Sequence, residues 1–239
     1  MITVHLKKLR KRTEISAEEE RAIRNAVLET RRLPADVVAI RSGEEVHASL
    51  LLLDGWMARS KDLASGERQV TELHIAGDFA DLHSSTLKCL DHDVLTLTEC
   101  TVAVVPHERL KDLFARYPHL ARVYWFMTNI DAAIHREWTL SLGRRSAIAR
   151  MAHLLCELDI RLAVGGLTEH NSFDFPLTQV EFGECLGLTS VHVNRTLQEL
   201  RRRGLVKLEN RRATILNVAL LKQTAEFDDT YLYIEKRAR

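Results

Sequence analysis

The stretch from Pro176 to Arg201 constrains the fold more than any other part of the chain. It contains two short segments of helical periodicity separated by Gly187, a residue type that adopts positive φ at little cost. Thr189 or Ser190 is placed to cap the second segment by accepting a backbone N–H bond. Its inward-facing residues are Val193, Leu197 and Leu200. The spacing predicts a helix-turn-helix.

The outward face of the second predicted helix has the chemistry of a nucleic-acid reader. It presents Ser190, Val191, His192, Asn194, Arg195 and Gln198. An ordinary αα-hairpin is the alternative and is commoner among proteins at large. Gly183 lies in the middle of the first helix, where glycine costs about 1 kcal/mol relative to alanine. We expect the second helix to cross close to it, and a close crossing favours the helix-turn-helix.

A β-hairpin is predicted directly after the second helix. Gly204 ends the helix, 205–208 and 213–216 have strand composition, and 209–212 forms the turn. Residues 190–212 contain seven Arg or Lys against two Glu, a local charge of +5 in a chain of net charge +1. A winged helix with a phosphate-facing surface explains this local excess.

Composition excludes several classes of protein. With 46% hydrophobic and 28% charged residues, the chain of 239 residues is expected to fold. There is no apolar run of membrane-spanning length, and residues 1–20 lack the apolar core of a secretory signal. The widely spaced cysteines are Cys89, Cys100, Cys156 and Cys185. They indicate free thiols in a reducing cytoplasm and no metal site.

The N-terminal half changes from helix to short strands. Residues 17–30 have helical spacing, ended by Pro34. Short apolar segments separated by turn residues follow, at 37–40, 46–53, 56–60, 69–75, 94–98 and 101–105. No helix long enough for a parallel crossover lies between them, so we expect an antiparallel jelly roll.

A long helix is predicted to begin at Pro118. Five apolar residues follow the three-four spacing of a coiled-coil seam: Leu120, Val123, Met127, Ile130 and Ile134. Such a stripe also suits packing within one chain. Because Tyr124, Trp125 and Phe126 occupy other faces of the helix, we expect burial on several sides and assign the seam to a homodimer.

The fold class predicted is α+β, with an N-terminal antiparallel jelly roll, a long dimerisation helix and a C-terminal winged helix. The expected divisions are 1–117 for the roll with flanking helices, 118–142 for the dimerisation helix, 143–223 for the winged helix and 224–239 for a tail. Gly143 is the expected hinge. Residues 143–222 carry 12 basic and 8 acidic side chains, whereas the remainder carries 22 and 25. This asymmetry favours a DNA-facing C-terminal domain.

This order and size of parts resembles the CRP/FNR family of bacterial transcription regulators. The motifs that are similar are 142–147 at the hinge, 177–206 in the helix-turn-helix and Gly77–Phe79 in the roll. The resemblance implies a homodimer that binds a two-fold symmetric operator in double-stranded DNA. It also implies control of transcription through contact with RNA polymerase or through occlusion.

The chain departs from the cyclic-nucleotide sensors of that family. Those sensors hold the phosphate with a Gly-Glu pair and a later Arg-Ser pair. The matching segments here are 79–82 and 89–92, no arginine occurs from Glu72 to His107, and Asp91 and Asp93 would repel a phosphate. We therefore expect no cyclic-nucleotide binding.

Cofactors of other branches are also not expected. Iron–sulfur sensors of the family carry an N-terminal cysteine set, and no cysteine precedes Cys89 here. His74, His83 and His92 are conceivable haem ligands, but isolated histidines are more often surface or core residues. No cofactor is predicted, and the effector stays open.

The recognition helix differs from the common family pattern of Glu followed by Ser-Arg or Gly-Arg. The positions here are Val191, Asn194 and Arg195, of which Arg195 retains the bidentate bond to guanine. Asn194 suits adenine and Val191 suits a thymine methyl. The predicted DNA contacts are Thr178, Thr189, Ser190, Val191, His192, Asn194, Arg195, Arg201, Arg211 and Arg212.

Two other functions are alternatives to a DNA-binding regulator. A cupin-like enzyme or metal-binding protein needs a His-x-His pair, which is absent from this chain. A constitutive regulator, with the roll acting only as a scaffold, is compatible with the missing ligand residues. The prediction is a regulator that is not an enzyme.

Overall fold

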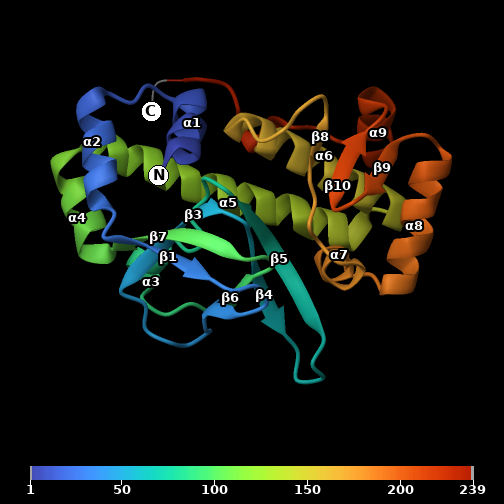
Figure 1. The fold of residues 1–239 in the computed structure, drawn as a ribbon, viewed down its shortest axis with the longest axis horizontal. Helices are drawn as coiled ribbons and strands as arrows, with labels where there is room; N and C mark the ends of the chain where they lie inside the picture. Colours follow the sequence, from blue (N-terminus) through green and yellow to red (C-terminus); the bar gives the residue numbers. More distant parts are fainter. Residues whose placement is uncertain (1, 238–239) are drawn as a thin grey trace. The chain divides into compact units, whose positions relative to one another are not determined.

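The computed structural model describes residues 2–237, and the chain divides into two compact units (Figure 1). Among the described residues, the first unit comprises 2–61, 72–132 and 233–237, and the second comprises 62–71 and 133–232. The division falls inside the long helix, and not at Gly143 as the sequence predicts. Of the helices in residues 2–237, none is both long and apolar enough to cross a bilayer.

The jelly roll predicted for the first half is confirmed. Its two antiparallel sheets have the strand orders β1-β7-β3 and β2-β6-β4-β5. The strands are β1 (Glu29–Leu33), β2 (Val38–Ile40), β3 (Ala48–Asp54), β4 (Trp56–Asp62), β5 (Arg68–Ile75), β6 (Asp93–Thr96) and β7 (Cys100–Pro106).

The central strand β7 contributes to hydrophobic cores on both faces of its sheet. Ala103 and Val105 belong to a cluster shared with the helices, whereas Val102 and Val104 belong to the cluster between the two sheets. Alternate residues of a strand point to opposite faces. Burial on both faces explains why β7 reads as a continuous apolar run and not as an alternating one.

The helices of the first unit differ from the prediction at the N-terminus. The helix α2 (Ala17–Ala26) is capped by a reciprocal Ser16–Glu19 box and ends at Ala26, not at Thr30. Residues 29–33 form the edge strand β1, whose polar sequence gives no strand signal of its own; pairing with β7 specifies it. The helix α1 (Thr3–Arg12), not predicted, covers the same core, as do α4 (His107–Arg116) and part of α5 (Pro118–Arg144).

The predicted hinge at Gly143 is misplaced. The helix α5 continues through Gly143 to Arg144, and Ser146 then caps α6 (Ala147–Gly165) by accepting a bond from the Ala149 amide. A glycine within a helix is unfavourable but does not by itself end one. The change of direction follows Arg144 and is made by the Ser146 cap.

The second unit is a winged helix. Around α6 lie α7 (Gln179–Leu186), α8 (Ser190–Arg202) and α9 (Val218–Ala225), with the short η1 (Thr230–Leu232) after them. The wing has three strands in the order β8-β10-β9, namely β8 (Ser172–Asp174), β9 (Val206–Glu209) and β10 (Arg212–Ile215). The strand β8 was not predicted.

Candidate nucleic-acid interface

Capping side chains fix both helices of the predicted helix-turn-helix. Thr178 accepts a bond from the Glu181 amide, and the Glu181 carboxylate accepts one from the Thr178 amide. Thr189 caps α8 by accepting from the His192 amide. Gly187 ends α7 in the left-handed region, with φ +59°. The predicted turn chemistry is therefore confirmed.

Gly183 is required by the turn and not by a helix crossing. A Cβ atom at Gly183 would lie closer than van der Waals contact to the backbone carbonyl oxygen of Leu188, while the side chain of Val193 stays 3.5 Å away. The backbone after the turn therefore passes over Gly183. The close approach predicted at Gly183 is therefore present, but the backbone at Leu188 makes it and not the second helix.

Arg150 of α6 connects the end of α5 to the end of α7. Its guanidinium donates to the carbonyl oxygens of Ser141 at 3.1 Å, Leu142 at 3.1 Å and Arg145 at 3.2 Å, and also to that of Leu186. Carbonyls in the last turn of a helix lack intrahelical partners. One half-buried arginine thus satisfies several of them and fixes where α7 begins its turn into α8.

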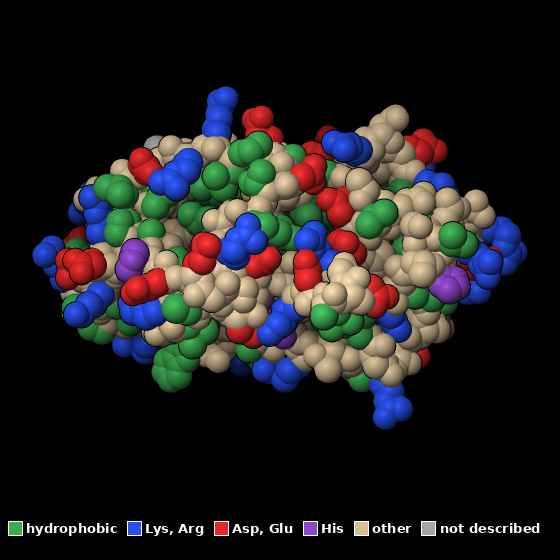
Figure 2. All heavy atoms as spheres, turned by 90° about the horizontal axis from the view of Figure 1, so that it is seen from below, with side chains coloured by type: hydrophobic (Ala, Val, Ile, Leu, Met, Phe, Trp, Pro, Cys, Tyr) green, Lys and Arg blue, Asp and Glu red, His purple; other side chains and the backbone are tan. Residues whose placement is uncertain are grey.

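The helix α8 buries one face and exposes the other. Val193 and Leu200 are 0% exposed and Leu197 is 7% exposed, as the spacing predicted. The outward residues Ser190, Val191, His192, Asn194, Arg195 and Gln198 are all exposed. Val191 is 66% exposed, although its apolar side chain gains nothing from water. Figure 2 shows Lys and Arg side chains gathered over α8, at the right-hand end of the view.

Most cations around this surface are already paired. Glu199 accepts from Arg202 and Arg203 at 2.7 Å each, which keeps its pKa low, at about 2. Lys207 pairs with Glu209 at 2.9 Å. These pairs reduce the positive charge that is free to meet phosphate.

Three predicted DNA contacts also bond to the wing or lie on it. Arg201 donates to the Leu208 carbonyl, which joins the end of α8 to β9. Arg212 donates to Ser172 at 2.8 Å and to Asp174 at 3.2 Å, both on β8. Arg211 sits in the turn between β9 and β10 with φ +57°.

Arg195 and Arg211 are the available cations of this surface. Among residues 2–237, neither has an ion pair or a side-chain hydrogen bond to another residue, and Arg195 lies on the exposed face of α8. A guanidinium without an intramolecular partner keeps all five donors for a base edge or a phosphate.

The hydroxyl groups of Thr178 and Thr189 cap α7 and α8, and each still has a hydrogen that it can donate. Each accepts a backbone N–H bond with its oxygen. A hydroxyl group can accept and donate at the same time. Both hydroxyl hydrogens therefore stay available to an acceptor such as a phosphate oxygen.

The seam predicted for dimerisation is wrong, because those residues are buried within the chain. Leu120 and Val123 are 0% and 1% exposed in the helix-covered core, and Met127 packs against the same cluster. Ile130 and Ile134 are 4% and 3% exposed. Apolar spacing marks a buried stripe without revealing which chain buries it. Four of the five side chains are buried within the chain, and Met127 is partly buried.

A different stripe of α5 is exposed. Trp125 is 70% exposed, and at helical spacing after it come the exposed residues Asn129, Ala132, Arg136 and Thr139. Tryptophan is enriched at protein–protein interfaces, which makes this stripe a candidate contact face. The sequence signal was Trp125 itself, which fits no position of the buried stripe.

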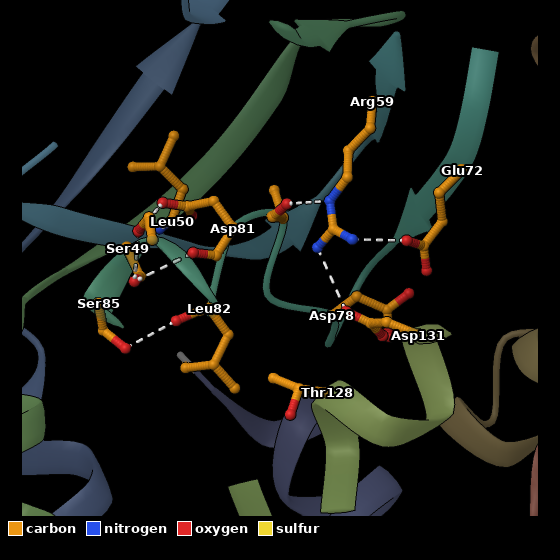
Figure 3. A network of polar contacts seen from close by, with 12 residues as sticks. Ser49, Leu50, Arg59, Glu72, Asp78, Asp81, Leu82, Ser85, Thr128 and Asp131 are labelled. Carbon is orange, nitrogen blue, oxygen red and sulfur yellow. Dashed lines mark hydrogen bonds and ion pairs between the residues drawn. The ribbon is translucent and has the colours of Figure 1, made fainter. Parts of the chain in front are cut away.

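A buried ionic network occupies the roll interior next to α5. Arg59 of β4 donates to Glu72 at 2.6 Å, to Asp131 of α5 at 3.2 Å and to the Ala80 carbonyl at 2.8 Å (Figure 3). Its side chain is 3% exposed. Burial alone would lower the pKa of Arg59, but the carboxylates of Glu72 and Asp131 raise it overall. Arg59 is therefore charged and fully engaged.

Asp81 forms the adjoining part of this network. It accepts from the Leu50 amide and from Ser84 at 2.7 Å, and Ser84 in turn contacts His107 at 3.0 Å (Figure 3 shows Asp81 between Ser49 and Leu82). Burial raises the pKa of Asp81 to about 6. The serine bonds to the aspartate directly, so these residues do not form the relay of a hydrolase.

The cysteines and histidines show no arrangement for a metal. In residues 2–237, no three His, Cys, Asp or Glu side chains are grouped as a metal site. Cys100, Cys156 and Cys185 are buried free thiols and Cys89 is exposed. The ring of His92 lies 5.2 Å from that of His83 and pairs with Asp91 at 2.9 Å.

The C-terminal tail, whose order the sequence left open, is held by a buried carboxylate. Glu157, 0% exposed, accepts from Tyr231 at 2.8 Å, from Trp138 at 3.1 Å and from Arg161 at 3.0 Å. Burial and the neighbouring Glu157 carboxylate raise the pKa of Tyr231, which stays protonated. The tail, α5 and α6 therefore meet at Glu157.

Comparison with known proteins identifies both parts of the chain. The model of the Crp-like helix-turn-helix domain matches residues 149–224, and that of the cyclic nucleotide-binding domain matches residues 30–117. The chain is 29% identical over 218 residues to the transcriptional activator protein FnrL of Cereibacter sphaeroides, which covers 88% of this chain and 86% of FnrL.

Two further relatives support this assignment. A probable transcriptional activator of Rhizobium leguminosarum bv. viciae is 31% identical over 191 residues, covering 78% of this chain and 76% of the activator. The structure of FixK2 from Bradyrhizobium japonicum has a TM-score of 0.75 at 23% identity and covers 82% of this chain and 96% of FixK2, a likeness of fold. With its jelly roll, long helix and winged helix in this order, the chain belongs to the CRP/FNR family of transcription regulators.

Proposed function

We propose that the chain acts as a homodimer that reads a two-fold symmetric operator with α8 of each protomer. The observation that carries this proposal is the exposed, unpaired Arg195 on a helix capped at Thr189. A bidentate arginine–guanine pair contributes about 1–3 kcal/mol of discrimination. Asn194 and Val191, exposed beside it, suit adenine and a thymine methyl.

The exposed stripe of α5 supports a dimer in which two such helices face each other. Trp125 supplies the apolar area, and the short side chain of Ala132 permits close approach. A two-fold axis along α5 would present two recognition helices to successive major grooves of one DNA face. The regulator would work in the cytoplasm, through contact with RNA polymerase or occlusion of it, and has no enzymatic role.

We also infer that cyclic nucleotides are not its effectors, although the roll matches a cyclic nucleotide-binding domain. A bound phosphate would have to compete with Glu72 and Asp131 for Arg59. Asp81, with a pKa of about 6, is mostly ionised at neutral pH and adds a third negative charge. The residues present therefore do not fit a phosphodiester.

No haem is proposed either. His92 bonds through Nδ1 to Asp91, His74 is 1% exposed within the roll, and His83 lies against the His92 ring. Axial ligation needs a histidine nitrogen that faces a cavity of porphyrin size. None of these three histidine rings is placed in this way.

Selection of bound sites from random double-stranded DNA tests the proposal. The purified full chain, with its visible spectrum recorded first, should enrich a two-fold symmetric site with G·C at one position of each half-site. Enrichment of no motif, or of one without two-fold symmetry, would remove the proposed function. A Soret band in the spectrum would contradict the absence of haem.

A further inference from the structure

We propose that the jelly roll binds a small apolar molecule carrying a protonated amine, in a cavity between its two sheets. The cavity has a volume of about 310 Å³. Its lining includes none of Arg59, Glu72 or Asp131, and it adjoins the network of Figure 3 through Leu50, whose amide donates to Asp81. Eight apolar residues line it: Leu33, Ala39, Ile40, Val46, Ala48, Leu50, Val102 and Val104.

The cavity exists because the sandwich is not closed along its edge strand. In β1, all residues except Leu33 are exposed. The strand β2 has only three residues, and its pairing with β6 shifts register between Val38 and Ile40. A strand this short cannot cover the inner face that β1, β7 and β3 present. The apolar interior therefore opens to solvent at this corner.

The walls of the cavity are continuous with the core between the sheets. Ile40, Leu50, Val102 and Val104 belong to that core, and the remaining apolar wall residues pack against it. Ala39 and Ala48 contribute single methyl groups, and this leaves the volume unfilled. Ligand sites are mostly apolar concavities of about 300–1,000 Å³. The cavity lies at the lower end of that range and suits a ligand of one or two rings.

The charge at the rim selects the polar end of the ligand. Arg31 is already paired with Glu29 at 2.5 Å. Glu44 approaches Arg41 only to 3.8 Å, with both side chains more than 60% exposed. Glu45 has no ion-pair partner among the described residues. His47 also lines the cavity, and with Arg31 paired to Glu29 the carboxylates of Glu44 and Glu45 favour a cation over an anion at this rim.

The alternative is an unfilled packing defect, and binding measurements separate the two. Three ligands with one naphthalene body are compared: 2-(1-naphthyl)ethylamine, 2-(1-naphthyl)ethanol and 1-naphthylacetate. An aliphatic amine of this kind is protonated at pH 7, as the lysine side chain is. Each is titrated by calorimetry into the full chain without DNA, so failure to bind DNA would not affect the result.

The amine should bind one per chain with a dissociation constant on the order of 10–100 µM, from typical ligand efficiencies. The alcohol should bind about two- to fivefold more weakly, as expected for loss of one exposed ion pair, and the carboxylate more weakly still. Glu45→Gln should remove the advantage of the amine over the alcohol. Glu108→Gln, a neutralised carboxylate exposed on α4, should leave it unchanged.

Filling the cavity gives the second test. Ala48→Phe should reduce binding of the amine more than tenfold. If Ala48→Phe does not fold, Ala39→Leu on the opposite wall is used in its place and should have the same effect. The proposed site is wrong if binding does not saturate by 2 mM amine, or if a folded variant with the filled cavity binds the amine as tightly as the wild type does. The charge assignment is wrong if the carboxylate binds as tightly as the amine. That such a ligand would be an effector rests on the proposed function, and operator titrations with and without amine measure it separately.

Discussion

Arg59 and Asp131 are 72 positions apart in the sequence, yet their side chains form an ion pair of 3.2 Å between the roll and α5. The same guanidinium holds Glu72, which is 1% exposed. Taking charges out of water is costly, and the cost is offset only when each charge has its partners. One arginine therefore compensates both carboxylates where the roll meets the first part of α5, beside the apolar packing of Leu120 and Val123.

Arg59→Met should destabilise the protein strongly. Removal of one partner leaves the carboxylates of Glu72 and Asp131 near each other without their cation, which costs about 3–5 kcal/mol in buried pairs. Urea unfolding followed by tryptophan fluorescence measures the change. Lys61→Met is the matched control, since its pair with Asp91 is exposed and is worth at most about 1 kcal/mol. Equal losses for both variants would show that burial of Arg59 is unimportant.

Acid should weaken the fold through His5. Its ring bonds to the Gly77 carbonyl at 2.8 Å and to the Tyr124 hydroxyl at 2.9 Å, and burial lowers its pKa to about 4. In the unfolded chain the His5 imidazole binds a proton below about pH 6.5, whereas in the folded chain it does so only below about pH 4. Stability falls as pH drops through this window, by up to about 3 kcal/mol.

A His5→Gln variant isolates this contribution. Asp81, with a pKa raised to about 6, acts in the opposite direction but is common to both proteins. The difference in unfolding free energy between wild type and His5→Gln should shrink as pH is lowered from 7 to 4. A difference independent of pH would mean that His5 does not titrate in this range.

Trp125→Glu should produce a folded monomer. The side chain is 70% exposed in one chain, so a carboxylate costs little there, but two facing carboxylates in an apolar interface would not associate. Light scattering should give the monomer mass, with circular dichroism unchanged. Ile130→Glu, 4% exposed, should instead unfold the chain. Lys111→Glu on the exposed face of α4 should stay dimeric, and a dimeric Trp125→Glu would refute the assigned stripe.

Arg195→Ala should weaken the operator and spare random DNA. The expected loss is about 1–3 kcal/mol per half-site, with guanine preference lost at one position. Arg211→Ala should weaken both duplexes alike and reduce the salt slope by about 0.9 per lost phosphate contact. Arg202→Ala should change least, because Glu199 already pairs with Arg202. Equal loss on both duplexes for Arg195→Ala would make that arginine a phosphate contact.

The order of the two domains and the helix-turn-helix were predictable because local chemistry specifies them. The positive φ of Gly187 and the Thr189 cap are decided by residues next to them in sequence. The strand β1 was missed because its polar sequence becomes a strand only through pairing with β7, more than 60 residues later.

The dimer seam shows what periodicity omits. A three-four stripe from Leu120 to Ile134 reports burial, and the structure satisfies that burial within one chain. The sequence also does not show which cations lack an ion-pair partner. Arg195 and Arg202 look alike in the sequence, and only the position of Glu199 distinguishes them. Nothing local marks the Arg59 network either, because its partners come from separate parts of the chain.

The pairing of cations around α8 bears on how the regulator finds its operator. Non-specific affinity for DNA grows with the number of phosphates that free cations neutralise. Here Glu199 and Glu209 hold three of the seven cations of residues 190–212 in ion pairs, and those three are less free to meet phosphate. The protein should therefore dwell only briefly on the rest of the genome at physiological salt. A larger share of the protein would be free in solution, not bound to non-specific DNA, and able to bind an operator when one becomes accessible.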